Sequence, residues 1–175
     1  MIETLQDEFG DTGIVQYPDQ LDQPKADKND RRTPRWFFLQ CVDRFGVFVT
    51  DVAATAANSQ CADHCQDGLN EEWSRLNWCN PPYGPPGTIE KWIAKARKER
   101  DWFSRRTLML LPADTSTSWF QDVSKTEYVE LVPFRLAFEA PDGSTKGNSA
   151  KFGSVLVYIA PKIARPKKAR KGRAA

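Results

Sequence analysis

A proline-rich loop near the middle of the chain carries the residues best suited to chemistry. Residues 80–87 read NPPYGPPG and follow directly on the apolar run RLNWC at 75–79. Two adjacent prolines exclude a helix interior or a central strand, so a rigid loop begins where the apolar run ends. The Asn80 side chain and the Asn80 and Pro81 carbonyls are acceptors, and Tyr83 adds a flat aromatic face. This loop suits a planar amino group on a ring, held by its two N–H donors while the ring is stacked.

A second polar residue follows another short apolar run. VFVT at 47–50 is β-branched and aromatic, which is typical of a buried strand, and Asp51 comes directly after it. In open sheets of parallel strands, ligands bind beyond the carboxyl ends of the strands. We therefore expect Asp51 and Asn80 to share one crevice.

The elements that must position these residues alternate between helix and strand. A helix is predicted from an N-cap at Thr33, with Pro34 in its first turn, to Gly46. A second helix over 88–103 places apolar residues on one face and charged residues on the other. The apolar face comprises Ile89, Trp92, Ile93, Ala96 and Phe103, and the charged face comprises Lys91, Lys95, Lys98 and Glu99. The remaining predicted elements are strands at 75–79, 107–112, 128–134, 135–140 and 152–160 and a short helix in 116–123.

This alternation predicts an α/β fold with a mostly parallel sheet that is covered on both faces. The loop between 135–140 and 152–160 is too short for a crossover helix. We therefore expect these two strands to form a C-terminal antiparallel hairpin at the edge of the sheet.

Composition and charge limit which class of protein this chain can belong to. The 175 residues, 40% of them hydrophobic, suit one packed domain, and no apolar run approaches the ~20 residues of a membrane span. The N-terminus lacks the features of a signal peptide, so a cytoplasmic location is expected. Residues 1–30 hold eight acids and two lysines, which predicts a flexible acidic segment. Residues 162–175 hold seven basic residues and no acid, which favours a disordered arm that meets nucleic acid over a merely solubilising tail.

The four cysteines are expected to be reduced, because the chain shows no secretion signal. The closely spaced Cys61, His64 and Cys65 resemble part of a metal-binding site. A closed zinc site needs four ligands, usually in two spaced pairs, and the second pair is missing here. We expect no metal.

The NPPY motif is that of S-adenosylmethionine-dependent amino-group methyltransferases, and the wider pattern resembles the small phage-type DNA N6-adenine methyltransferases. The resemblance runs from about Thr33 to Ile159. It is carried by RTPRWFF, FGVFVTDVAATAAN, DGLNEEW, NWCNPPYGPPGTIEKWIAKA, LMLLPADTSTSWF and RLAFEAPDGSTKGNSAKFGSVLVY.

The resemblance implies a Rossmann-like, S-adenosylmethionine-dependent methyltransferase sheet, a catalytic domain over 31–161, and double-stranded DNA as partner. The implied catalytic residues, which act on an adenine flipped out of the duplex, are Asn80, Pro81, Pro82 and Tyr83. The implied cofactor contacts are Thr33, Pro34, Phe37, Asp51, Ala53, Ala54 and Asp67. The expected DNA contacts are Arg135, Lys146, Asn148, Lys167, Lys168 and Arg170.

Two other functions share parts of this pattern. NPPY also occurs in protein-glutamine and RNA methyltransferases, although a protein methyltransferase would not need the basic tail. A DNA-binding module could keep the fold and lose catalysis, but the intact Asn80 and Tyr83 speak against that.

Overall fold

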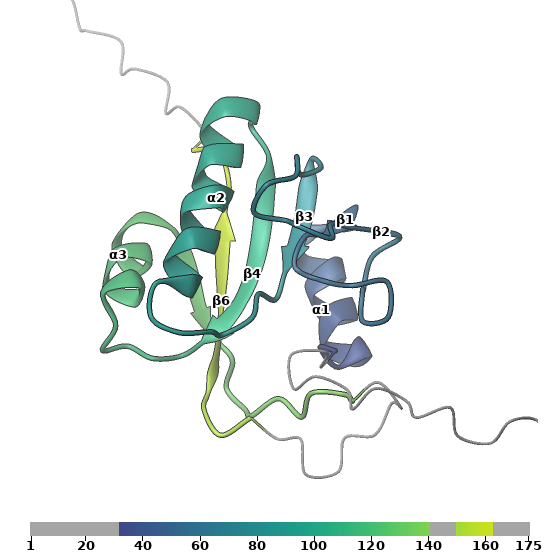
Figure 1. The fold of residues 1–175 in the computed structure, drawn as a ribbon. Helices are drawn as coiled ribbons and strands as arrows, with labels where there is room; N and C mark the ends of the chain where they lie inside the picture. Colours follow the sequence, from purple (N-terminus) through teal and green to yellow (C-terminus); the bar gives the residue numbers. More distant parts are fainter. Residues whose placement is uncertain (1–31, 141–149, 163–175) are drawn as a thin grey trace, which may run out of the picture.

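A mixed β-sheet with helices on both faces organises the part of the chain described by the computed structural model, residues 32–140 and 150–162 (Figure 1). The strands of this part are β1 (Thr50–Asp51), β2 (Asp63–His64), β3 (Leu76–Cys79), β4 (Arg106–Pro112), β5 (Tyr128–Leu131) and β6 (Ser154–Ile159). Its helices are α1 (Arg35–Phe45), α2 (Thr88–Phe103) and α3 (Ser118–Thr126). The strand order is β2-β1-β3-β4-β6-β5. The first four strands in this order are parallel, and β6 is antiparallel to both of its neighbours.

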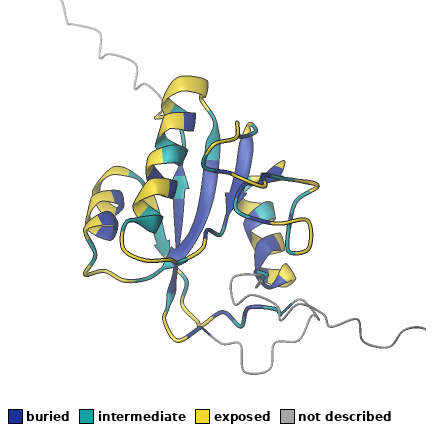
Figure 2. Ribbon diagram, in the orientation of Figure 1, coloured by how far each residue is buried: buried dark blue, intermediate teal, exposed yellow. Residues whose placement is uncertain are grey.

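The two faces of the sheet carry separate apolar cores, because side chains alternate along each strand. In β4, Leu108 and Leu110 face α1, whereas Met109 and Leu111 face α2 and α3. The strands are therefore buried on both sides while each helix keeps an exposed outer face (Figure 2). The predicted α/β class, with helices on both faces, is confirmed; the sheet is mixed, parallel from β2 to β4 and antiparallel at β6.

Helix positions follow the predictions, with differences at α1 and at α3, which was predicted in 116–123 but spans Ser118–Thr126. The helix α2 has the predicted bounds, and α3 begins after Thr117, whose hydroxyl accepts a hydrogen bond from the Phe120 amide at 3.4 Å. Thr33 is not the N-cap of α1: Pro34 occupies that position and no side chain caps the helix. The hydroxyl of Thr33 is directed instead to Asn80, as described below.

Two residues of α2 lie differently from the prediction. Glu99 was expected on the charged outer face, yet it is only 2% exposed. Lys95 Nζ lies 2.7 Å from its carboxylate, and Arg105 also donates to it. These two cations satisfy the buried charge, which holds the pKa of Glu99 below its usual value against the opposing effect of burial. Phe103, expected on the apolar face, lies in the last turn and is 48% exposed.

The prediction that 135–140 and 152–160 form an antiparallel hairpin is wrong. Residues 135–140 form no strand of the sheet, and β6 pairs instead with β4 and β5. The reason is burial: β6 is almost wholly buried on both faces, so its backbone groups need strands on both edges. Leu136 and Phe138 still contribute to the core on the α1 side.

The predicted strand at 47–50 is shorter and later than expected. Only Thr50 and Asp51 form β1, while Val47 and Val49 are exposed on either side of the buried Phe48. Asp51 therefore ends the strand rather than following it. The two-residue strand β2 was not predicted, because its sequence Asp-His carries no apolar signal.

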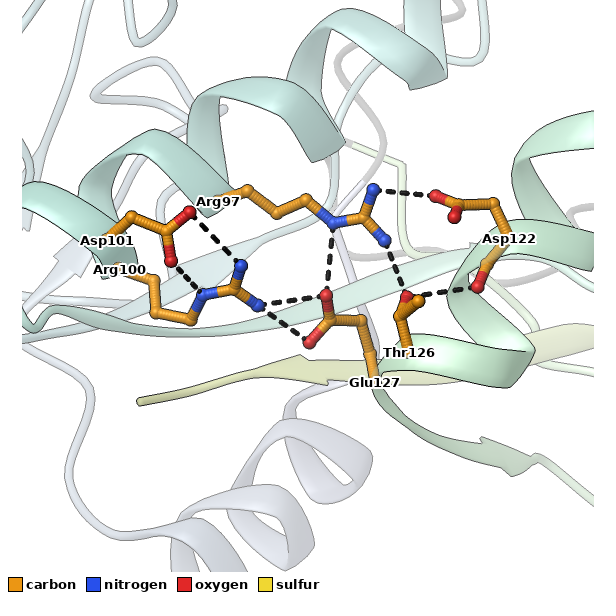
Figure 3. A network of polar contacts seen from close by, with 6 residues as sticks. All are labelled: Arg97, Arg100, Asp101, Asp122, Thr126 and Glu127. Carbon is orange, nitrogen blue, oxygen red and sulfur yellow. Dashed lines mark hydrogen bonds and ion pairs between the residues drawn. The ribbon is translucent and has the colours of Figure 1, made fainter. Parts of the chain in front are cut away.

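An arginine and carboxylate network fastens α2 to the end of α3 (Figure 3). Arg97 donates to Asp122 at 2.6 Å and to Glu127 at 3.0 Å, and Arg100 donates to both oxygens of Glu127 at 2.9 and 3.0 Å. The Glu127 side chain is only 4% exposed. These contacts fix the two helices that cover one face of the sheet.

Neither terminal prediction can be compared with the structure, since 1–31 and 163–175 lie outside the described residues. Among the helices of the described part, none has the length and apolar character needed to cross a membrane.

Candidate functional site

The carboxyl ends of β1 and β3 lie side by side and bring the predicted residues to one edge of the sheet. Asp51 is in register with Trp78, and the Val52 amide donates to the Trp78 carbonyl at 3.0 Å. Asn80 follows β3 directly, two residues beyond Trp78. Parallel pairing thus places Asp51 and Asn80 at the same edge of the sheet, and the crevice expected between them stays a prediction.

The Asn80 carboxamide is held from two sides. Its Nδ2 atom donates to the Thr33 hydroxyl at 3.3 Å. The Tyr83 hydroxyl lies 3.0 Å from Asn80 Oδ1 and 3.1 Å from the Leu110 carbonyl oxygen at the end of β4. Because a phenol has a single proton, it serves one of these acceptors at a time. When the proton points to Leu110, the Asn80 oxygen is free to accept from another donor.

The two prolines stiffen this loop in different surroundings. Pro81 is buried and Pro82 is exposed. Within the described residues, no donor engages the main-chain carbonyl of Pro81, so it remains an acceptor beside Asn80. The loop ends at Gly87, whose φ of +90° is costly for a residue with a side chain, and α2 begins at the next residue. The loop is therefore fixed at both ends, by β3 and by α2.

An aromatic residue missed by the sequence reasoning lies against Tyr83. The Phe152 ring is 39% exposed, and its centroid lies 5.6 Å from that of Tyr83 in an edge-to-face arrangement. Phe152 comes shortly before β6, the strand that pairs with β4. The signal was an aromatic residue at the start of an apolar run, but its place depended on the strand pairing that was predicted wrongly.

Asp51 is buried with an incomplete set of partners. It is 3% exposed, and its Oδ2 atom accepts from the Gln60 amide at 3.1 Å. Its Oδ1 atom has no hydrogen-bond partner among the described residues. Burial raises the pKa of Asp51 to about 6, against the lowering effect of the Gln60 and Ala53 amides. A buried acceptor without a donor is a position where a ligand can complete the hydrogen bonding.

The other predicted cofactor residues before Asp67 lie in two segments, the start of α1 and the stretch after β1. Thr33, Pro34 and Phe37 are buried around the start of α1; Ala53 lies in the turn after β1 and Ala54 directly follows it. This turn sits close to the end of β1, and the start of α1 is linked to Asn80 through Thr33.

Asp67 is exposed and already has partners within its own loop. Its carboxylate accepts from Asn70 Nδ2 at 2.8 Å. The next residue, Gly68, touches the turn after β1 so closely that an added Cβ would lie 1.8 Å from the Val52 carbonyl oxygen. This contact excludes any other residue at 68, and it brings the Asp67 loop against the end of β1.

Gln60 was also missed, although it contacts two of the site's segments, the end of β1 and the start of α1. Its main chain binds Asp51, its side-chain Nε2 donates to the Thr33 carbonyl, and Arg35 donates to its Oε1 at 3.2 Å. No sequence pattern marks such a residue, since its partners lie 9 to 27 positions away.

The cysteine thiols are poorly suited to act as nucleophiles. Burial raises the pKa of Cys41 and of Cys61 to about 12, and it also raises the pKa of Cys79, next to Asn80. These thiols stay protonated near neutral pH, and the thiolate is the reactive form. In the described part of the chain, no group of three or more His, Cys, Asp or Glu residues could hold a metal ion.

Of the six residues predicted to contact DNA, only Arg135 lies in the part of the chain that the structure describes. Arg135 is exposed and donates through Nη1 to the Ala150 carbonyl at 3.1 Å, although it does not open a strand as predicted. The other five lie outside the described residues: Lys146, Asn148, Lys167, Lys168 and Arg170.

Comparison with known proteins places the chain in a family. A family model described as DNA N-6-adenine-methyltransferase (Dam) matches residues 20–171. A DNA N-6-adenine-methyltransferase of Escherichia phage T1 is 30% identical over 154 residues, covering 71% of this chain and 62% of the relative. One of Haemophilus phage HP1 (strain HP1c1) is 27% identical over 145 residues, covering 79% of this chain and 82% of the relative. No solved structure matches the chain. With most of its length matched by the family model, the chain belongs to the DNA N-6-adenine-methyltransferase family.

Proposed function

We propose that this protein transfers a methyl group from S-adenosylmethionine to the exocyclic amine of adenine in DNA. Family membership supports the reaction, and the observation that carries it is the Asn80–Tyr83 loop at the carboxyl edge of the sheet. That loop presents the acceptors that the sequence predicted for an amino group. The mixed strand order, with parallel β1, β3 and β4 and an antiparallel β6, supports a Rossmann-like methyltransferase sheet.

The residues at the end of β1 fit the cofactor. S-adenosylmethionine carries an ammonium group and hydroxyl groups that donate hydrogen bonds, and the buried Asp51 Oδ1 is an acceptor with no donor among the described residues. Once bound, the cofactor supplies an activated methyl group on a sulfonium. The residues that would hold it are Thr33, Pro34, Phe37, Asp51, Ala53, Ala54 and Asp67.

The catalytic contribution of Asn80 and Pro81 is orientation of the amine. The lone pair of the adenine amine is delocalised into the ring, which makes the nitrogen a weak nucleophile. Hydrogen bonds from its two N–H groups to Asn80 Oδ1 and the Pro81 carbonyl draw these hydrogens out of the ring plane. The lone pair then localises on nitrogen and points at the methyl group. Tyr83 allows this by donating its proton to Leu110 and leaving Asn80 Oδ1 open.

Tyr83 and Phe152 supply an aromatic surface for the extruded base. Flipping a base out of a duplex costs a few kcal/mol. Stacking on one aromatic side chain returns about 1–3 kcal/mol. The half-exposed Phe152 ring beside Tyr83 enlarges the surface on which that energy is gained. Arg135 and the basic residues beyond the described part are the proposed contacts to the DNA backbone.

The test is a methylation assay on unmodified DNA followed by mass spectrometry of the nucleosides. Wild type should yield N6-methyladenine, and Asn80→Ala should lose about 10²–10³ in kcat, the usual effect of removing one preorganised polar group. Gln121→Ala, which removes a side-chain amide from the exposed face of α3, is the control and should keep full activity. N4-methylcytosine would correct the base. Absence of methylated nucleosides together with methylated glutamine in a protein substrate would refute the proposal.

A further inference from the structure

The Gln60 side chain is a buried link between two segments of the site. It is 8% exposed and lies in the loop after β1. Its Nε2 atom donates to the main-chain carbonyl of Thr33, and its Oε1 atom accepts from Arg35 Nη1 at 3.2 Å. Arg35 also donates to the Gln60 carbonyl at 3.0 Å. Both ends of the amide are thus occupied, which fixes one rotamer and one orientation of the side chain.

These contacts extend in both directions to the residues of the proposed reaction. On one side, the main-chain amide of Gln60 donates to Asp51 Oδ2 at 3.1 Å. On the other side, the Thr33 hydroxyl accepts from Asn80 Nδ2 at 3.3 Å. Asp51, Gln60, Thr33 and Asn80 therefore form one continuous chain of hydrogen bonds between the cofactor segment and the catalytic loop.

We propose that Gln60 is a positioning residue for methyl transfer: it holds Thr33 in place, and Thr33 in turn sets the orientation of the Asn80 carboxamide. This inference rests on the proposed function, because it assigns a role within the same reaction. A carboxamide that pivots freely would spend less time with Oδ1 toward the substrate amine. Gln60 acts through Thr33 and touches neither the amine nor the methyl group.

Glutamine suits this place because it donates at one end and accepts at the other. A glutamate at position 60 keeps the acceptor for Arg35 but places a second oxygen against the Thr33 carbonyl with no proton to donate. The substitution Gln60→Glu thus removes the link to Thr33 selectively. The main-chain hydrogen bond to Asp51 does not depend on the side chain and should persist.

The experiment compares Gln60→Glu with a matched control, Gln121→Glu. Gln121 also donates its Nε2 atom to a main-chain carbonyl, that of Thr115 at 2.7 Å, but it lies on α3 away from the site. We expect Gln60→Glu to lower kcat about ten- to a hundredfold, as small misplacements of reacting groups do, with a much smaller change in cofactor affinity. Gln121→Glu should keep wild-type kcat. If Gln60→Glu does not fold, Gln60→Asn replaces it, since the shorter amide cannot reach Thr33.

A double-mutant comparison shows whether the effect passes through Thr33. In a Thr33→Val background the hydroxyl that holds Asn80 is gone, so adding Gln60→Glu should lower kcat much less than it does in wild type. An equal loss in both backgrounds would overturn the proposal. An unchanged kcat with weakened cofactor binding would overturn it as well, because Gln60 would then serve the cofactor alone.

A measurement that needs no activity separates this inference from the proposed function. The side-chain amide signals of Asn80 in a ¹⁵N-labelled protein are assigned by their loss in Asn80→Ala. Gln60→Glu should shift these signals and Gln121→Glu should not. If wild type methylates no DNA, the proposed function fails, and the amide shift still decides whether Gln60 positions Asn80: an unchanged signal overturns the proposal.

Discussion

Replacing Asp51 by asparagine should change how the stability of the ligand-free protein depends on pH. Asp51 is 3% exposed, and one of its oxygens has no hydrogen-bond partner in the described part of the chain. Burial without a compensating cation disfavours the carboxylate, which is why its pKa is raised from 3.8 to about 6. Asparagine does not ionise. The difference in the free energy of unfolding between the two proteins therefore reports the ionisation of Asp51 alone.

The sign follows from proton binding in the two states. Below pH 3.8 the carboxyl is protonated in both the folded and unfolded chain, and above about pH 6 it is ionised in both. Between these values the folded chain keeps a proton that the unfolded chain has lost, so the contribution of Asp51 to stability falls as pH rises. Each unit of pKa difference corresponds to about 1.36 kcal/mol, which makes the full cost about 3 kcal/mol at pH 7.

Urea denaturation of both proteins between pH 4 and pH 7.5, without cofactor, measures this quantity. As pH rises from 4 to 7, the free energy of unfolding of Asp51→Asn should increase relative to that of wild type by about 2.4 kcal/mol, since the remainder of the full cost is already present at pH 4. Any constant offset, such as an unpaired amide hydrogen in the variant, cancels in that comparison. A difference that stays the same over this range would refute the idea that Asp51 is desolvated. Calorimetric titration with S-adenosylmethionine at pH 7.5 should show weaker binding to the variant, which separates stability from function.

Three further perturbations test other parts of the structure. Tyr83→Phe keeps the ring that contacts Phe152 but loses the hydroxyl bond to the Leu110 carbonyl that holds the loop against β4, so kcat should fall about tenfold, less than in Tyr83→Ala. Deleting 162–175 should flatten the plot of log DNA affinity against log salt by about 0.9 for each phosphate that the tail neutralises, and an unchanged slope would show that the tail does not touch DNA. Glu127→Gln weakens the contacts of Arg97 and Arg100 and should cost about 1–3 kcal/mol by urea denaturation; no loss would mean the network is not stabilising.

The parts of the fold that sequence predicted well are those set by local chemistry. The helix over 88–103 was bounded correctly because its apolar period begins right after Gly87 and the prolines before it. The strand β3 was recognised because it is a short apolar run stopped by Asn80 and two prolines. Parallel pairing of β1 with β3 then brought Asp51 and Asn80 to the same edge, as expected from the general behaviour of such sheets.

The errors arose where a residue's neighbours lie far away in the sequence. Residues 135–140 alternate like a strand, yet β6 takes its partners from 106–112 and 128–131. Which strands pair with β6 depends on which strand edges need hydrogen-bond partners in the folded sheet. That information cannot be read from a single sequence. Phe152 and Gln60 were missed for the same reason, since their site contacts, with Tyr83 and Thr33 respectively, span the sheet and the loop after β1.

The Oδ1 atom of Asp51, unpaired among the described residues, and the hydrogen bonds that lead from Asp51 to Asn80 suggest how the two ends of the site are coupled. In the ligand-free protein, Asp51 is a buried carboxylate that lowers stability at neutral pH. Under the proposed function, a donor from the cofactor would remove that cost and restrain the loop that holds Gln60, whose side chain binds the Thr33 carbonyl next to the hydroxyl that accepts from Asn80. Binding energy gained at the end of β1 would then help to order the Asn80 amide at the end of β3. Since such coupling is reciprocal, an amine held by Asn80 should also tighten the cofactor. Under this proposal, the stability that the free protein loses through the ionised Asp51 would be regained when cofactor and adenine are both bound.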